Sequence, residues 1–372
     1  MKYDLLIVGG GPVGAGLARA AQGLSVALLA HERRTATVRR EGTFDARVYA
    51  LSPANVAFLG LDEAALTPVH AMRVFGDAGA CIEFDAYRAG VPALAHIVED
   101  GALQDALWQG LDAQIGRFEA LVVDHDRALV QLEGGRELQA SLVVAADGAQ
   151  SRVREQAGIK ATVKPYGQHA VVANFACERA HANTAYQWFQ GGPVLALLPL
   201  PGPHVSMVWS LPDAEAARIA GLAAEALCAE LGAATGGVLG SFGLVTPPKA
   251  VPLRRLKAGR MIAPRLALAG DAAHVIHPLA GQGLNLGLQD ARTLSQVLRS
   301  REPVREPGDW RVLRRYERMR AEPILAMDAM VDGLHRLFGA QGRAAAALRN
   351  HGLNLTGRLE VVKNLLIKQA MN

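Results

Sequence analysis

The stretch that decides the fold is Tyr3-Asp4-Leu5-Leu6-Ile7-Val8, followed at once by Gly9-Gly10-Gly11-Pro12-Val13-Gly14. The apolar run is typical of a buried parallel strand. In the turn, Gly9 allows a tight bend, Gly11 lets a pyrophosphate approach the backbone, and Gly14 lets helix and strand pack closely. A helix expected over 15–22 would offer its N-terminal amides to the phosphates. Because the motif stands between a strand and a helix, the sequence predicts a dinucleotide-binding fold.

A second strand is expected over 26–29, and an acidic residue should follow it. Glu32 lies 18 residues after Gly14, and we expect its carboxylate to bind ribose hydroxyls. The alternative is a solvated charge beside Arg33 and Arg34.

Two later apolar runs are expected to be strands of the same sheet. Residues 141–146 end at Asp147-Gly148, and residues 265–269 end at Gly270-Asp271. The second pair leads to a glycine-spaced helix start at Gly281, which suits a further contact with the diphosphate and ribose. Because these strands are far apart in the sequence, the domain that they form must be discontinuous.

The stretch from about 163 to 260 has a different pattern. Short apolar runs separated by turns, at 170–173, 186–189, 194–198 and 205–209, are typical of an antiparallel sheet. An alanine-rich helix is expected over 214–234, and the chain after about residue 284 is expected to be helical.

Composition limits the class of protein. Of 372 residues, 50% are hydrophobic and 20% are charged, which excludes an intrinsically disordered chain. Aromatic residues make up 5%, which argues against nucleic-acid binding by base stacking. The net charge of +4 is mildly basic and would suit an anionic membrane surface or nucleic acid, but an ordinary enzyme can carry it too. We expect neither a transmembrane helix nor a signal peptide. The separated cysteines, Cys81, Cys177 and Cys228, fit no metal site and are expected to be reduced and buried.

Three motifs stand in a fixed order along the chain. They are the glycine turn at 9–14, Asp147-Gly148-x-x-Ser151-x-x-Arg154, and Gly270-Asp271 with its helix start. In this the chain resembles the group A flavoprotein aromatic hydroxylases, the family that includes p-hydroxybenzoate hydroxylase. A narrower similarity, to the ubiquinone-biosynthesis hydroxylases, rests on Asp45-x-Arg47-Val48-Tyr49-Ala50-Leu51-Ser52-Pro53, Ile97-Val98-Glu99-Asp100 and Arg315-Tyr316-Glu317-Arg318. Asp100 replaces the asparagine that is usual in that family.

The resemblance implies an α/β fold. A Rossmann-like FAD-binding domain of the glutathione reductase and p-hydroxybenzoate hydroxylase type would carry an inserted antiparallel β-sheet substrate domain and C-terminal helices. The expected FAD-binding domain comprises 1–75, 98–162 and 262–298. The substrate domain comprises 76–97 and 163–261, and a C-terminal helical region covers 299–372.

The resemblance also implies an activity. NAD(P)H, a transient electron donor without a Rossmann domain of its own, would reduce FAD. O2 would then give a flavin hydroperoxide that hydroxylates the ring of a polyprenylated phenol in ubiquinone biosynthesis. Two alternatives stay open: another flavoprotein oxidoreductase of this fold acting on a different aromatic compound, and a non-catalytic FAD-binding subunit. A quinone-biosynthesis protein complex is a candidate partner.

The same resemblance assigns residues to the cofactor. No acid or base is needed, and Pro278 and Gly281 are expected to shape the surroundings of the flavin ring. His274 and His277 flank them, and we expect hydrogen-bonded structural roles for both. The residues expected to bind FAD are Gly9, Gly11, Pro12, Val13, Gly14, Glu32, Arg33, Arg47, Gln104, Asp147, Gly270, Asp271, Pro278, Gly281, Gly283, Leu284 and Asn285.

The substrate is expected to be apolar, because the predicted inner sheet carries few charges. Val171, Phe189, Leu198 and Trp209 are the candidate contacts, with a plain core role as the alternative for each.

The C-terminal region leaves two further choices open. Eight arginines between 299 and 320 favour either a solvated helix face or contact with anionic lipid. The apolar stripe of 359–371 is expected to pack on the body or on a partner. The expected location is the cytoplasm, with peripheral contact at the inner face of the membrane as an open alternative.

Overall fold

The computed structural model describes all residues except 1, 33–41, 77–79, 190, 278–280 and 340–372, and describes side chains as far as Gly333. The described chain forms two compact units. Unit 1 is built from the described parts of Met1–Thr37, Gly101–Lys164 and Arg254–Met330. Unit 2 is built from those of Val38–Asp100, Pro165–Leu253 and Val331–Asn372. Three long elements, β12 (Ala161–Cys177), β16 (Phe242–Ala258) and α9 (Trp310–Gly339), contribute residues to both units.

Unit 1 is centred on a largely parallel sheet with the strand order β17-β18-β11-β1-β2-β8. The pairs β1–β11, β1–β2, β2–β8 and β11–β18 are parallel, and the hairpin β9–β10 pairs with β11. The runs predicted at 3–8, 26–29, 141–146 and 265–269 are therefore confirmed as neighbouring strands. The bounds are β1 (Lys2–Val8), β2 (Val26–Ala30), β8 (Ala113–Ile115), β9 (Phe118–Val123), β10 (Ala128–Leu132), β11 (Glu137–Ala145), β17 (Ile262–Ala263) and β18 (Leu266–Leu268).

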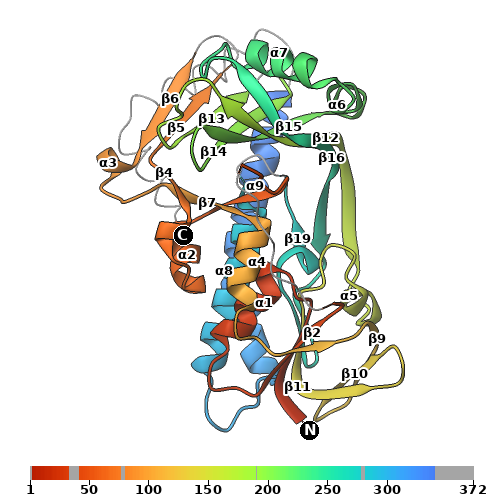
Figure 1. The fold of residues 1–372 in the computed structure, drawn as a ribbon. Helices are drawn as coiled ribbons and strands as arrows, with labels where there is room; N and C mark the ends of the chain where they lie inside the picture. Colours follow the sequence, from red (N-terminus) through yellow and green to blue (C-terminus); the bar gives the residue numbers. More distant parts are fainter. Residues whose placement is uncertain (1, 33–41, 77–79, 190, 278–280, 340–372) are drawn as a thin grey trace. The chain divides into compact units, whose positions relative to one another are not determined.

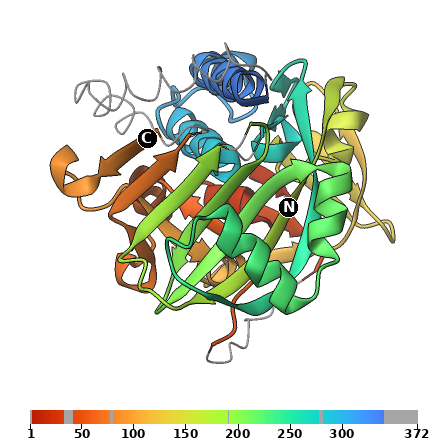
Figure 2. The ribbon, with the colours of Figure 1, turned by 90° about the horizontal axis from the view of Figure 1, so that it is seen from above.

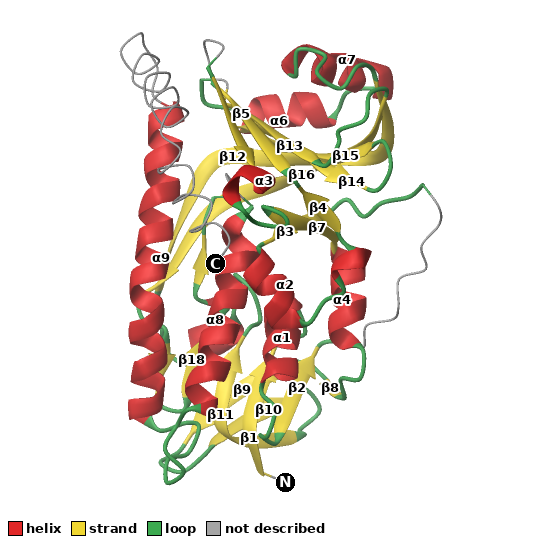
Figure 3. Ribbon diagram, turned by 90° about the vertical axis from the view of Figure 1, so that its left-hand side faces the viewer, coloured by secondary structure: helices red, strands yellow, loops and turns green. Residues whose placement is uncertain are grey.

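Helices α1 (Pro12–Ala20) and α8 (Gln282–Arg299) lie side by side against this sheet, with the first part of α9 next to α8 (Figures 1 and 3). The close approach of α1 and α8 depends on a missing side chain. A Cβ atom on Gly287 would lie 2.8 Å from Cγ2 of Val13. The other elements of the unit are α4 (Asp100–Trp108), α5 (Arg152–Gln156), the 3-10 turn η2 (Gly270–Ala272) and β19 (His274–Val275), which pairs with the end of β16.

Unit 2 contains a second sheet, ordered β16-β12-β15-β14-β13-β5-β6. The pairs β12–β15, β15–β14, β14–β13 and β5–β6 are antiparallel, as the alternating sequence predicts, whereas β13 and β5 are parallel. A three-stranded sheet, β3-β7-β4, completes the unit. The bounds are β3 (Val48–Leu51), α2 (Pro53–Leu59), η1 (Glu63–Ala65), β4 (Thr67–Val69), β5 (Ala71–Phe75), β6 (Cys81–Asp85), α3 (Ala86–Ala89), β7 (Ala95–Glu99), β13 (Thr184–Phe189), β14 (Val194–Leu200) and β15 (His204–Pro212).

Two helices, α6 (Asp213–Ala220) and α7 (Ala224–Ala234), cover one face of the larger sheet of unit 2 (Figure 2). The prediction of a single helix over 214–234 is therefore wrong. The first helix, α6, ends at Gly221, whose amide closes its last turn. Successive side chains of a strand point to opposite faces, and every second one meets the helices. The buried cluster so formed includes Phe175, Trp188, Ile219 and Leu227.

Two stretches account for most of the difference between the units and the predicted domains. The described part of 38–75, predicted with the FAD-binding domain, groups with unit 2 because β3 and β4 pair with β7 and β5 pairs with β13. Residues 299–330, predicted as part of a separate helical region, group with unit 1. The helix predicted over 359–371 lies outside the described residues. Within the described chain, no helix is both long enough and apolar enough to cross a membrane.

A buried carboxylate joins four parts of unit 1. Asp290 of α8 has no exposed surface. Its Oδ2 accepts hydrogen bonds from the amide of Gly270 at 2.9 Å and from Nε2 of His274 at 2.7 Å. Its Oδ1 accepts one from Nε of Arg320 in α9 at 2.6 Å. Next to it, the hydroxyl of Tyr316 donates to the carbonyl of Leu268 at the end of β18, at 2.8 Å.

This arrangement keeps the Asp290 carboxyl ionised. Burial opposes ionisation, but the charges of His274 and Arg320 and the hydrogen bonds from His274 and Gly270 outweigh it, so the pKa of Asp290 lies below its ordinary value. Because an ionised carboxylate only accepts hydrogen bonds, Nε2 of His274 carries the proton in this pair. The hydrogen-bonded structural role predicted for His274 agrees with this geometry.

We predict that Asp290→Asn lowers the free energy of unfolding by about 3–5 kcal/mol, because it leaves the guanidinium of Arg320 buried without its counter-charge. Thermal and urea unfolding measure the effect. A matched control is Asp124→Asn, which removes a carboxylate paired with Arg127 on the surface at 3.3 Å. An exposed pair of this kind contributes about 0–1 kcal/mol. If the two variants unfold alike, Asp290 does not hold the unit together.

The effect of pH follows from the direction of the shift. A carboxyl with a lowered pKa in the folded state stabilises the fold above its unfolded pKa, about 3.9, and loses this contribution as pH falls through the lower folded value. We therefore predict that the stability of the unmodified protein falls more steeply below about pH 4 than that of Asp290→Asn. Parallel curves for the two proteins would contradict this.

Candidate functional site

The glycine turn forms a tight backbone cradle at the carboxyl end of β1. The amide of Gly9 donates to the carbonyl of Leu29 in β2 at 2.9 Å. Gly9 has φ +119°, and a Cβ atom there would lie 2.2 Å from the carbonyl oxygen of Ala146. A Cβ atom on Gly14 would lie 1.9 Å from the carbonyl oxygen of Gly9. Both positions therefore require glycine, for the reasons that the sequence predicts.

The start of α1 is open to an anion. Gly11 precedes the helix without a side-chain cap, and a Cβ atom there would have no atom within 4 Å in the described structure. The first amides of a helix have no partner within the helix and carry its positive dipole end. An open backbone of this kind at a helix start is suited to a phosphate group.

Trp108 at the end of α4 holds the turn from the other side, a contact that sequence reasoning missed. Its Nε1 donates to the carbonyl of Gly10 at 2.9 Å. Its ring also lies where a Cβ atom on Gly10 would be, at 2.6 Å from Cζ2. The middle glycine of the turn is therefore required by an aromatic ring that is 98 residues away in the sequence.

The second motif stands next to this cradle. Asp147 follows β11, and its Oδ2 accepts from the amide of Val153 at 3.2 Å. Its Oδ1 is buried and has no hydrogen-bond partner among the described residues. Burial raises the pKa of this carboxyl above its ordinary value, against hydrogen bonds that lower it. A buried acceptor beside the glycine turn fits a polar ligand at this place.

Arg154 connects the second motif to the third. The oxygen of Ser151 accepts from the amide of Arg154 at 3.0 Å and so caps α5. The buried guanidinium of Arg154 donates to the carbonyl of Ala272 at 2.9 Å and to that of Ala149 at 3.1 Å. The aspartate-glycine segment and the Gly270-Asp271 segment are thus held together by a residue of the first of them.

The third motif places an exposed carboxylate and a second helix start, without a side-chain cap among the described residues, in the same unit. Asp271 lies in η2 and is exposed. Helix α8 begins after Gly281, which has φ +62° and provides no side-chain cap. Gly283 and Leu284 are half-buried and Asn285 is buried in the first turn, whereas Pro278 lies outside the described residues.

Four further residues predicted to bind the cofactor are Glu32, Arg33, Gln104 and Val13. Glu32 lies two residues beyond β2 and is exposed, at the sheet edge where the glycine turn also lies. Arg33 lies outside the described residues, and Gln104 is half-buried in α4. Val13 packs against Gly270 and Gly287. The assignment of these residues to the cofactor stays a prediction.

Arg47 belongs to unit 2, where the first two of the three segments that carry the narrower similarity meet. Residues 48–51 pair with 96–99 as the antiparallel strands β3 and β7. The guanidinium of Arg47 lies over the ring of Tyr49, 5.0 Å from its centre. The hydroxyl of Tyr49 donates to Oδ1 of Asp100 at 2.9 Å, and the amide of Asp100 donates to the carbonyl of Arg47 at 3.0 Å. Asp100 therefore fixes the Arg47 segment.

The four predicted substrate residues lie on two different faces of the unit 2 sheet. Val171 and Trp209 belong to the cluster that α6 and α7 cover, so the structure supports the plain core role for them. Phe189 and Leu198 alternate with Trp188 and Leu197 of that cluster and therefore point to the opposite face.

The face of Phe189 and Leu198 also carries a polar group. Leu198 packs among apolar residues of the β3-β7-β4 sheet. Ser206 stands opposite Leu198 across the β14–β15 pair, and its hydroxyl is buried without a partner among the described residues. Sequence reasoning missed Ser206, because a single serine in a strand gives no signal of its own.

Within the described residues, no group of three or more histidine, cysteine or acidic side chains could hold a metal ion. Unit 1 instead offers two open helix starts, a glycine cradle and two carboxylates, which suit a dinucleotide. Comparison with known proteins identifies the dinucleotide. The family model described as "FAD binding domain" matches residues 118–329.

Similarity to characterised sequences extends over the whole chain. It is 33% identical over 387 residues to "3-demethoxyubiquinol 3-hydroxylase" of Escherichia coli K12, covering 99% of this chain and 98% of that protein. It is 33% identical to "Ubiquinone hydroxylase UbiL" of Rhodospirillum rubrum, covering 99% and 89%. It is 31% identical to "Ubiquinone biosynthesis monooxygenase COQ6, mitochondrial" of Caenorhabditis elegans, covering 98% and 95%.

Solved structures share the fold. p-Nitrophenol 4-monooxygenase PnpA from Pseudomonas putida DLL-E4 matches with a TM-score of 0.79 and 17% identity, covering 100% of this chain and 98% of that one. HpxO of Klebsiella pneumoniae, solved with FAD and uric acid, matches with a TM-score of 0.76 and 19% identity, covering 99% and 96%. The chain therefore belongs to the FAD-binding monooxygenases of the p-hydroxybenzoate hydroxylase type, as an FAD-dependent hydroxylase related to those of ubiquinone biosynthesis.

Proposed function

We propose that this enzyme hydroxylates the aromatic ring of a polyprenylated phenol in ubiquinone biosynthesis, with NAD(P)H as electron donor and O2 as oxygen donor. The observation that carries the proposal is the similarity to 3-demethoxyubiquinol 3-hydroxylase over nearly the full length of both chains. The likeness to solved structures supports the fold and does not identify a substrate, because those enzymes are less than 25% identical to this chain.

Residues of unit 1 would hold the cofactor in a way that its backbone favours. The amides at the start of α1 would bind the pyrophosphate, with Gly9 and Gly14 keeping the turn tight enough for its approach. Asp271 would accept hydrogen bonds from hydroxyls near the ribityl chain. Bound FAD supplies the hydride-accepting and oxygen-activating chemistry. The open start of α8 would then stabilise negative charge on the ring, because helix N-termini favour anions.

The substrate side of the proposal rests on unit 2. The face that carries Phe189 and Leu198 is mainly apolar, which suits a prenylated compound. The buried hydroxyl of Ser206 on the same face would supply a hydrogen bond to a polar substituent of the ring. A few placed polar groups in an apolar lining are typical of sites that orient a small molecule.

A cytoplasmic location is part of the proposal, and the state of the cysteines supports it. The three cysteines form no disulfide. Burial raises the pKa of the Cys177 thiol to about 11, so it stays protonated and unreactive. Cys81 is exposed and Cys228 half-buried, so the prediction that all three are buried is wrong. Cys81 lies on β6, at the edge of its sheet.

We predict that Asp271→Ala weakens FAD binding by at least about tenfold, because a carboxylate that accepts hydrogen bonds is worth about 1.5–3 kcal/mol. Flavin fluorescence titration of the apoprotein measures the dissociation constant. Asp126→Ala removes an exposed carboxylate of the same unit and is the matched control. Normal affinity in Asp271→Ala would show that this carboxylate does not bind the cofactor.

The proposed reaction predicts that a polyprenylated phenol stimulates NAD(P)H oxidation by the FAD-loaded enzyme. One oxygen atom from labelled O2 should appear in the product, as measured by mass spectrometry. If the bound flavin is never reduced by NADH or NADPH, the non-catalytic alternative is favoured instead. Reduction that no prenylated phenol stimulates would favour a different aromatic substrate.

The two faces of the unit 2 sheet allow a matched pair of variants. Leu198 and Leu222 are both half-buried leucines, but Leu222 packs against the cluster on the face that α6 and α7 cover. We predict that Leu198→Ala raises the KM for the phenol several-fold, whereas Leu222→Ala changes stability with little effect on KM. Equal effects of the two variants on KM would place the substrate elsewhere.

A further inference from the structure

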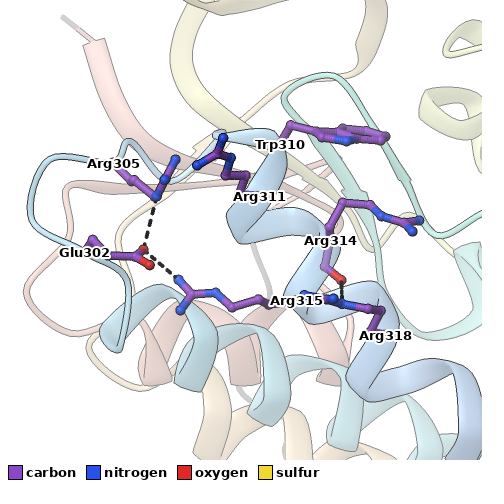
Figure 4. Close-up of a pocket in the computed structure, with 7 residues that line it drawn as sticks. All are labelled: Glu302, Arg305, Trp310, Arg311, Arg314, Arg315 and Arg318. Atoms are coloured by element: carbon purple, nitrogen blue, oxygen red, sulfur yellow. Dashed lines mark hydrogen bonds and ion pairs between the residues drawn. The ribbon is translucent and has the colours of Figure 1, made fainter.

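A pocket of about 340 Å³ lies where α9 begins in unit 1 (Figure 4). Four of its residues, Arg311, Arg314, Arg315 and Arg318, repeat at intervals of three and four along the helix and so share one side of it. The other lining residues are Glu302, Arg305 and Trp310. None of these seven residues belongs to the motifs that the cofactor uses.

The acidic residues of this region are already engaged. Glu302 is paired with Arg305 at 3.3 Å and with Arg315 at 3.1 Å, as the dashed lines of Figure 4 show. Arg305 also pairs with Asp309 at 2.8 Å, and Arg314 pairs with Glu317 at 2.5 Å. These pairs join three carboxylates to three of the five arginines that line the pocket, so two arginines are left without an ion pair.

The unpaired charge is located on two residues. Arg311 and Arg318 form no ion pair with a carboxylate among the described residues, and both are exposed. The charge of Arg311 does act on the nearby carboxylate of Asp309 and helps to lower its pKa. Nε of Arg318 donates to the carbonyl of Arg314 at 3.3 Å, which positions its side chain along the helix. Like charges repel, and a bound anion would relieve the repulsion among the arginines that line this pocket.

We propose that this pocket binds a phosphate-bearing anion. The planar guanidinium group donates two parallel hydrogen bonds to phosphate oxygens, which makes arginine well suited to this ligand. Asp309 accepts from the amide of Arg311 at 2.7 Å, so the side chains rather than the helix start carry the site. Trp310, 50% exposed, adds an apolar surface at the pocket.

Two sources can supply the phosphate: a soluble phosphorylated compound, or the headgroup of an anionic phospholipid. The chemistry of recognition is the same for both. The alternative to the proposal is that these arginines form only a solvated face of α9. Such a face would have no preference for phosphate groups over other anions. The site is independent of the proposed reaction, so it can be tested with FAD bound and without turnover.

The test uses the FAD-loaded full chain, so that the cofactor site is filled. Isothermal titration calorimetry with inorganic pyrophosphate measures binding of the soluble form. Co-sedimentation with phosphatidylglycerol vesicles, compared with phosphatidylcholine vesicles, measures binding to a headgroup. The variant Arg311→Gln/Arg318→Gln removes the two unpaired charges. The control Arg117→Gln/Arg260→Gln removes the same charge from two exposed arginines of unit 1 outside the pocket.

We expect the unmodified protein to bind at least one probe, and the pocket variant to bind it at least about tenfold more weakly. The control should change affinity less than twofold, and flavin content should stay the same in all three proteins. Binding of pyrophosphate alone identifies a soluble ligand, and binding of anionic vesicles alone identifies a headgroup. The proposal is overturned if neither probe binds, or if the pocket and control variants lose affinity equally.

Discussion

The Asp290 carboxylate is the constraint on which unit 1 depends. It is fully buried and charged, and a buried charge is tolerated only when every partner is in place. Its partners come from separate segments: Gly270 and His274 follow β18, and Arg320 comes from α9. The amide that it binds belongs to the residue just before Asp271. The position of Asp271, the carboxylate proposed to bind the cofactor, is thus set by a residue that need not touch the cofactor.

The three motifs predicted to bind the cofactor are held by side-chain contacts of the same kind. Trp108 closes the glycine turn, and Arg154 bridges the second motif to the third. Each contact uses a side-chain donor to satisfy a backbone carbonyl that a loop would otherwise leave unpaired. Loops that bind a dinucleotide must keep their amides open for phosphate, so their carbonyls need partners from elsewhere in the unit. This requirement explains why the network surrounds the glycine turn and leaves the start of α1 open.

The sequence predicted structure where it depends on neighbouring residues, and it did not predict contacts between segments that are far apart in the chain. Runs such as 3–8 and 141–146 predict buried strands because their neighbours in the chain decide that conformation. The roles of Trp108 and Asp290 arise only when distant segments meet, and neither residue stands in a spacing pattern. The break at Gly221 was missed because alanine favours a helix on either side of it. Val171 and Trp209 were chosen as apolar strand residues, and hydrophobicity alone does not distinguish the two faces of a sheet.

The arrangement of unit 2 leaves one face of its larger sheet as the candidate for substrate recognition. Because α6 and α7 bury one face of its sheet, variation of Trp188 or Trp209 would disturb packing before it altered recognition. The opposite face combines apolar side chains with the buried hydroxyl of Ser206, which lies across from Leu198. Relatives that share the fold and act on different rings can therefore differ on this face while keeping the helix-covered core. Under the proposed function, substrate choice and stability would be carried by alternate residues of the same strands, because successive side chains point in opposite directions.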